Sequence, residues 1–339
     1  MAVMSFDTLD DARLLVVTGK GGTGKTTVAA ALAVAAAARG RRVLVVEVEG
    51  RQGLAGLFGR RSLSYEETRV AARVAALAVD SEESLREYLG RFGAAPLARL
   101  LTWARLTRFI TAAAPGLGDV LLVGKVWEAA TRVRGGRPVY DLVVLDAPPT
   151  GRVVPFLRAP ETVAELARVG PIRHQADQVK DLLDDRGRTR VVFTCLPEEL
   201  PVTETLEGVG LLGGAGLPLG PIVVNQVVAD RLGSRARRLA ALVKDPGPLA
   251  VAAKEAGASI DDDALGVLLG EARDRQRVVA AQRRLIAELR AGAPELPVVE
   301  LPLLLDGAAG PDAVGDLARV LAAADLATRR APATAPART

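Results

Sequence analysis

Cysteine and histidine are nearly absent from this chain, which has one of each in 339 residues. With Cys195 as the only cysteine, one subunit can form no internal disulfide, no Cys-x-x-Cys redox pair and no cysteine-ligated zinc or iron–sulfur site. His174 has no second histidine with which to share a metal ion, so we expect it to make a surface or polar contact. We therefore expect no zinc or iron–sulfur cofactor, and several enzyme classes are excluded.

Long apolar runs and charge of one sign are also scarce. The 44 Lys and Arg residues exceed the 40 Asp and Glu residues by only four, too few at this length to predict a nucleic-acid partner. The longest apolar run, Val28–Ala38, is roughly half of the ~20 residues that a membrane-spanning helix needs. Asp7, Asp10 and Asp11 lie where a secretory signal would have basic and apolar residues. We expect a folded, cytoplasmic protein.

Apolar, β-branched runs recur along the chain and are separated by segments of helical length. Most of them lack alternation of polar and apolar residues, which is typical of parallel strands covered on both faces. The pattern predicts an α/β fold with a mostly parallel, doubly wound sheet and helical insertions. The expected strands are Leu14–Thr18, Val43–Val48, Val74–Val79, Leu142–Leu145, Val191–Thr194, Ile222–Val224 and Val298–Leu301.

A glycine-rich segment, Gly19–Thr26, follows the first expected strand and opens an expected helix. Its sequence, Gly-Lys-Gly-Gly-Thr-Gly-Lys-Thr, satisfies the P-loop pattern in the context that the motif requires. Backbone N–H groups of such a loop surround phosphate oxygens, Lys25 can reach the β and γ phosphates, and Thr26 can ligate Mg²⁺. ATP and Mg²⁺ are the expected cofactors, held by Gly21, Gly22, Thr23, Gly24, Lys25, Thr26 and Thr27.

Two further sequence features accompany this motif. Lys20, directly after the first motif glycine, is not required by an ordinary P-loop. The apolar run Tyr140–Asp146 ends in a carboxylate, and Asp146 is expected to hold Mg²⁺ through water. It continues as Ala-Pro-Pro-Thr-Gly-Arg up to Arg152, with Phe156–Leu157 shortly after.

With these residues the chain resembles the deviant Walker A ATPases of the arsenite-pump and tail-anchored-protein-targeting branch (ArsA/Get3), and especially its actinobacterial members. The resemblance covers roughly Leu14–Asp325. It implies a P-loop ATPase that forms a homodimer or pairs with a paralogous ATPase, with Lys20 contacting phosphate across the subunit interface. Arg152 replaces the usual histidine of the switch II motif.

In the same family, the loop after the second strand is switch I, and it carries an aspartate that positions the attacking water. The spacing from Lys25 assigns that role to Glu49, whose extra methylene displaces the carboxylate. Misplacement on that scale can cost ~100-fold in rate, so slow hydrolysis is expected. Glu47, on the same strand, is the alternative carboxylate.

The resemblance also implies that two later residues contact the nucleotide base. Asn225, at an expected strand end, can exchange hydrogen bonds with the adenine edge, and Pro302 falls in the loop that covers the base. A turn or helix N-cap is the alternative role for Asn225. A Thr-Glu-Thr segment, Thr203–Thr205, weakly matches a Thr-Glu pair of the family.

Six segments follow from these assignments. The nucleotide-binding core comprises 1–80 and 137–230, and 296–327 adds its last strand and helix; 81–136 and 231–295 are helical, and 328–339 lacks a core pattern, which predicts a disordered tail. We expect Ser81 to be the N-cap of the first insertion and Asp261–Asp263 to begin the last helix of the second.

The chain lacks the zinc-binding Cys-x-x-Cys clamp of the targeting ATPases, the metalloid cysteines of the arsenite pumps and a methionine-rich client groove, since Met1 and Met4 are its only methionines. We expect an ATP-driven dimeric switch that handles hydrophobic segments of client or membrane proteins, with any membrane attachment through a partner. A slowly hydrolysing module that scaffolds a paralogous subunit is the alternative, and metalloid efflux is disfavoured. The apolar residues of the first insertion can either pack in the protein core or line a client-binding groove. They are Leu85, Leu89, Phe92, Leu97, Leu100, Leu101, Trp103, Phe109 and Ile110.

Overall fold

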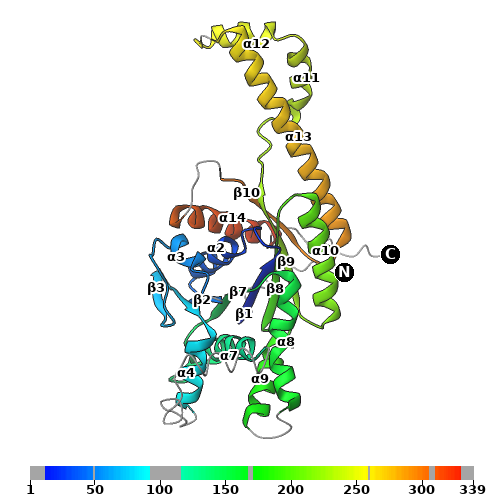
Figure 1. Ribbon diagram of the computed structural model, residues 1–339. Coiled ribbons are helices and arrows are strands. Elements are labelled where there is room, and N and C mark those ends of the chain that lie inside the picture. The colour runs from blue at the N-terminus through cyan, green and yellow to red at the C-terminus, as the bar shows by residue number, and fades with distance from the viewer. Residues whose placement is uncertain are drawn as a thin grey trace, which may run out of the picture.

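The computed structural model describes residues 12–48, 50–91, 116–166, 171–258, 260–304 and 310–329. Its centre is an eight-stranded sheet with the order β10-β9-β8-β1-β7-β2-β4-β3 (Figure 1). Only the β3–β4 pairing in this sheet is antiparallel. The predicted α/β class with a mostly parallel sheet is confirmed. The strands are β1 (Leu14–Gly19), β2 (Val43–Val48), β3 (Thr68–Ala71), β4 (Val74–Val79), β7 (Leu142–Asp146), β8 (Thr189–Cys195), β9 (Leu219–Val227) and β10 (Val298–Pro302).

Helices cover both faces of the sheet, which explains why β1, β2, β7 and β8 are buried at every position and mostly apolar. Leu14 and Val16 of β1 face one side, and Leu15 and Val17 face the other. The first side packs against α7 (Leu117–Thr131), α8 (Thr150–Leu166), α9 (Pro171–Asp184), α10 (Glu199–Gly214) and the C-terminal part of α13 (Asp262–Gly292). The second side packs against α2 (Lys25–Ala38), α3 (Gly53–Leu57) and α14 (Pro311–Arg329).

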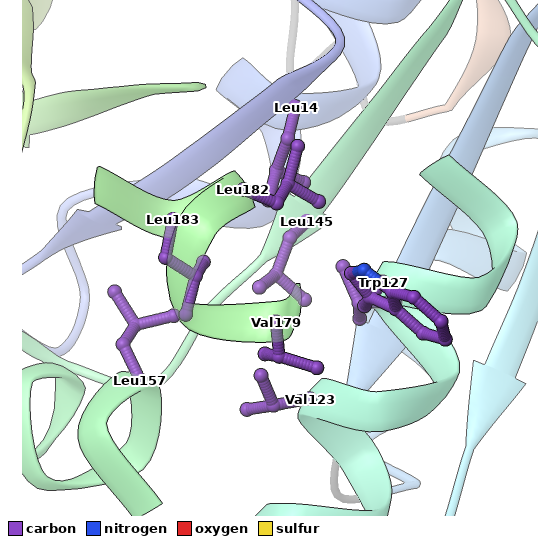
Figure 2. Close-up of a pocket in the computed structure, with 9 residues that line it drawn as sticks. Leu14, Val123, Trp127, Leu145, Leu157, Val179, Leu182 and Leu183 are labelled. Carbon is purple, nitrogen blue, oxygen red and sulfur yellow. The ribbon is translucent and has the colours of Figure 1, made fainter. Parts of the chain in front are cut away.

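Helices α7, α8 and α9 contact the strands that lead to the expected nucleotide site. Figure 2 shows the small pocket enclosed by these helices and the sheet, with Leu14 of β1, Leu145 of β7 and Trp127 of α7 around it. The remaining lining residues are apolar as well, so we interpret the pocket as core packing. Its lining joins α7 directly to the two strands that carry the P-loop and Asp146.

An arm formed by α11 (Ala236–Lys244), α12 (Gly247–Glu255) and the N-terminal part of α13 projects beyond the sheet (Figure 1). Its own small core centres on Leu239, Leu265 and Leu269. The Asp261 carboxylate accepts the backbone N–H of Ala264 at 2.7 Å, as expected for an N-cap at the start of this helix. At the base of the arm, Asp230 accepts backbone N–H bonds and pairs with Arg283.

The region 81–136 contains α4 (Ser81–Arg91), α7 and a short antiparallel pair, β5 (Val133–Arg134) and β6 (Arg137–Pro138). The predicted Ser81 cap is wrong by one residue. Asp80 is the cap, because its carboxylate accepts the backbone N–H of Glu83 at 2.8 Å.

Several predicted features fall outside the described residues, including 92–115 and the tail from 330. Among the expected groove residues, Leu85 is buried on α4. The side chain of Leu89 and the remaining groove candidates lie outside the described part. No helix in the described ranges is both long enough and apolar enough to cross a membrane.

Candidate functional site

The P-loop connects β1, in the middle of the sheet between β8 and β7, to the start of α2. Gly19 closes the strand with φ +149°, and a Cβ there would lie 2.2 Å from the carbonyl oxygen of Thr194, so only glycine fits. Gly24 is the N-cap residue of α2, with φ +86°, and as a glycine it has no side chain that could accept a hydrogen bond from the helix. The first backbone N–H groups of α2 therefore have no side-chain acceptor from the cap residue and can bind an anion.

Lys25 lies inside the loop with 6% of its surface exposed, and its Nζ donates to the carbonyl oxygen of Lys20 at 2.9 Å. The hydroxyl of Thr23 donates to the same carbonyl at 2.9 Å, which holds the loop in a closed turn. Burial lowers the pKa of Lys25, and the nearby carboxylate of Asp146 opposes that shift. The loop thus holds a desolvated cation where phosphate is expected.

Thr26 and Asp146, which are far apart in the sequence, are brought together at the start of α2 and the end of β7. The Thr26 hydroxyl donates to Asp146 Oδ2 at 2.7 Å, and Asp146 is fully buried. Glu47 is paired with Asp146 in the register of β2 and β7, and its Oε2 has no hydrogen-bond partner within the described residues. A hydroxyl and two buried carboxylates are a set of hard oxygen donors that fits Mg²⁺.

Glu47 also fixes the loop that follows β2. Its Oε1 accepts the backbone N–H of Gly53 at 2.7 Å, at the start of α3. Burial raises the pKa of Glu47, and the Gly53 hydrogen bond opposes that shift. A Cβ on Gly53 would lie 3.1 Å from Thr26 Cγ2, so the loop packs directly on the expected metal ligand. Glu49, the expected water-positioning residue, lies outside the described residues.

Arg51 of the same loop also reaches this site, although its sequence position gave us no reason to assign it a role. Its guanidinium lies 3.9 Å from Asp146 Oδ2 and donates to the backbone carbonyls of Asp146 and Val48, each at 3.4 Å. The available sequence signal was an arginine in the loop that follows a strand at the carboxyl edge of a parallel sheet.

Lys20 is held by a carboxylate of its own subunit. Its Nζ donates to Glu204 Oε1 at 2.6 Å, and the two side chains are 32% and 34% exposed. Glu204 belongs to the Thr203–Thr205 segment, on α10. The structure therefore joins the extra P-loop lysine to the Thr-Glu segment, which sequence reasoning treated as two unconnected features.

Asn225 and Pro302 lie at the ends of neighbouring strands, β9 and β10. Asn225 is 5% exposed, and its Nδ2 donates to the carbonyl oxygen of Thr23 at 3.1 Å. The amide thus contacts the P-loop backbone. Directly after Pro302, the backbone N–H of Leu303 donates to the carbonyl oxygen of Val227 at 2.8 Å. This hydrogen bond keeps the two strand ends together.

The switch II segment runs from Asp146 into α8. Its start is held by the Thr18 hydroxyl, which donates to the carbonyl of Pro148 at 2.8 Å. Arg152, in place of the usual histidine, donates to the Asp119 carboxylate at 3.0 Å, near the beginning of α7. Switch II is therefore tied to the first helical insertion.

The single cysteine and the single histidine have different surroundings. Cys195 is a free, fully buried thiol at the end of β8, and burial raises its pKa to about 11. His174 is exposed on α9, and its ring contacts the Gln178 amide at 3.1 Å. The described residues contain no group of three or more His, Cys, Asp or Glu side chains suited to a metal ion.

Comparison with known proteins shows the family of this chain. Residues 12–175 match the family described as anion-transporting ATPases. The chain is 40% identical over 307 residues to ATPase BagA of Mycobacterium tuberculosis, covering 88% of this chain and 89% of the relative. This chain belongs to the ArsA family of ATPases. ATP is therefore its substrate, and the resemblance inferred from the motifs is confirmed.

More distant relatives of this ATPase include proteins named get3 and ARSA1. ATPase get3 of Botryotinia fuckeliana is 25% identical over 262 residues, covering 66% of this chain and 74% of the relative. ATPase ARSA1 of Chlamydomonas reinhardtii is 24% identical over 288 residues, covering 67% of this chain and 37% of the relative.

Proposed function

We propose that this ATPase hydrolyses Mg-ATP at the carboxyl edge of the sheet and uses the nucleotide state to control subunit association. The observation that carries the proposal is the 2.7 Å hydrogen bond between Thr26 and Asp146, directly beside the buried Lys25. A hydroxyl and a carboxylate in this relation are the pair that holds the metal in P-loop ATPases. Bound Mg²⁺ would neutralise charge on the phosphates.

The chain's own residues have separable roles in this reaction. Lys25 and the N-terminus of α2 attract and orient the phosphates, while Thr26 and Asp146 fix the metal position. Glu49 orients the attacking water, and its longer side chain in place of aspartate makes turnover slow. Glu47 anchors the loop after β2 through Gly53 and is the alternative carboxylate for this role.

We assign to Lys20 the role of contacting the nucleotide of the facing subunit when subunits associate. One chain already has Lys25 and the loop amides around the phosphates, so a second loop lysine is best explained by a facing nucleotide. Because Glu204 holds Lys20 within the same subunit, association requires this ion pair to open. A phosphate on the facing subunit would then replace the carboxylate as the partner of the lysine.

The output of the switch is proposed to pass through the helices below the sheet. Arg152 of switch II pairs with Asp119 on α7, and α7 packs against β1 and β7 (Figure 2). A change in switch II would therefore move the insertion, which we propose handles hydrophobic segments of client proteins.

A nucleotide-held module that scaffolds a paralogous ATPase is the second candidate, and the glutamate at position 49 favours it because slow turnover suits a scaffold. Metalloid transport is disfavoured, since soft metal ions need several accessible thiolates and Cys195 is buried.

Phosphate release with and without Mg²⁺ tests the hydrolysis proposal. Asp146→Asn should abolish Mg-dependent release, whereas Glu288→Gln, at an exposed position on α13, should match the parent. Turnover by Asp146→Asn at the parental rate would overturn the assignment of this site.

A further inference from the structure

Glu47 is a fully buried carboxylate whose two oxygens have different surroundings. Its Oε1 accepts the backbone N–H of Gly53 at 2.7 Å and is thereby held to the start of α3. Its Oε2 has no hydrogen-bond partner among the residues that the structure describes. A buried carboxylate oxygen without a donor is unfavourable, and native proteins contain few of them. Glu47 Oε2 therefore points to a hydrogen-bond donor from outside the chain.

Glu47 lies on the face of the sheet that packs against α2. Val43 and Val45 of the same strand belong to the core cluster on that face, and alternate residues of a strand share one face. On the neighbouring strand β7, Asp146 is the register partner of Glu47. The Thr26 hydroxyl, at the start of α2, donates to Asp146 Oδ2 at 2.7 Å. Both carboxylates therefore face the place where Thr26 and Asp146 would hold the metal.

The two carboxylates concentrate negative charge at this place. Their charges repel each other, and the repulsion is strong because both side chains are shielded from water. Proteins usually hold Mg²⁺ through one or two carboxylates and the substrate phosphates, and the ion keeps several of its water molecules. Because β2 lies beyond β7 in the sheet order from β1, Glu47 is one strand further from the P-loop than Asp146. This position suits contact with the hydration shell of the ion.

We propose that Glu47 Oε2 accepts a hydrogen bond from the hydration shell of Mg²⁺ while Oε1 holds the loop after β2, so that one side chain couples the metal to this loop. A Cβ on Gly53 would lie 3.2 Å from Glu47 Oε1 and 3.1 Å from Thr26 Cγ2, so the three residues pack closely. Metal binding stabilises the loop, and the held loop raises metal affinity, because such coupling is reciprocal. This inference rests on the nucleotide site proposed above.

Binding of Mn²⁺ to the complex of the protein with ADP tests this role without relying on turnover, with free Mn²⁺ measured by electron paramagnetic resonance. Glu47→Gln keeps an oxygen to accept the Gly53 N–H but replaces the second oxygen with an amide that can only donate. It should weaken Mn²⁺ binding about 10-fold or more and change metal-free ADP binding about 2-fold or less. Glu66→Gln, at an exposed position before β3, is the matched control and should bind both like the parent.

Hydrogen exchange of the peptide that contains α3 tests the coupling in the parent protein itself. Mn²⁺ should slow this exchange in the ADP complex of the parent by about 5-fold or more, and should have no such effect in Glu47→Gln. Exchange in the parent that Mn²⁺ leaves unchanged would overturn the inference.

Three binding results separate the inference from its alternatives. Parental Mn²⁺ affinity in Glu47→Gln overturns it, and loss of phosphate release at that unchanged affinity would identify Glu47 as the catalytic base. Equal losses of Mn²⁺ binding and of metal-free ADP binding would show that Glu47 only supports the loop, which also overturns the inference. A parent protein that binds no ADP would instead overturn the proposed nucleotide site itself.

Discussion

Breaking the Lys20–Glu204 ion pair should strengthen nucleotide-dependent association. Glu204→Gln keeps the shape of the side chain and a hydrogen-bond acceptor but removes the charge that holds Lys20. Both side chains are about one-third exposed, at 32% and 34%, so solvent screens the pair and its worth is about 0–1 kcal/mol. At the upper limit this corresponds to about 5-fold in an equilibrium constant for each subunit.

A symmetric dimer opens two such pairs, so Glu204→Gln should lower the dimer dissociation constant by up to about 25-fold with Mg-AMP-PNP present. Analytical ultracentrifugation, with the protein alone and mixed with a paralogous ATPase, measures this constant. Glu207→Gln, at an exposed position on α10, is the matched control and should behave like the parent. Lys20→Ala should lose the nucleotide dependence. A dissociation constant that neither Glu204→Gln nor Lys20→Ala changes would refute a role for Lys20 across the interface.

Three other perturbations test separate parts of the account. Glu49→Gln should keep ATP binding and lose most phosphate release, while Glu49→Asp should hydrolyse faster than the parent; full turnover by Glu49→Gln would move the base elsewhere. Arsenite should leave ATPase activity unchanged in the parent and in Cys195→Ser, because the thiol is buried with a pKa of about 11; stimulation that survives Cys195→Ser would contradict this. Gly19→Ala should lower the free energy of unfolding by about 2–4 kcal/mol, since its Cβ would lie 2.2 Å from the Thr194 carbonyl. Gly210→Ala, inside α10 with open space around it, should not lower this free energy, and a denaturation midpoint of Gly19→Ala equal to that of the parent would argue against the strand packing.

The sheet and the P-loop could be predicted from the sequence because their signals are local. Strands buried on both faces have nearly continuous apolar runs, and Val43–Val48 and Val74–Val79 were predicted with the bounds that the structure has. The strand β3 has half-buried and exposed residues, so it gave no apolar run. At Asp80 and Ser81, two adjacent residues are both good caps, and the pattern could not separate them.

The contacts around the site could not be predicted in the same way. Lys20 and Glu204 are 184 positions apart, and their pairing depends on how α10 packs against β8, the strand beside β1. Arg51 reaches Asp146 because β2 and β7 are neighbours in the sheet, although their segments are far apart in the chain. Motifs identify such residues singly, whereas their distances follow from strand order and register.

Calorimetric titration of Mg-ATP into the parent and into Lys25→Ala is the most direct test of the central claim that this P-loop binds the nucleotide. Lys254→Ala, at an exposed position on α12, is the matched control and should bind like the parent. The account predicts binding by the parent and the control and no detectable binding by Lys25→Ala, because the buried ammonium is the main cation within the loop. Parental affinity in Lys25→Ala would contradict the account.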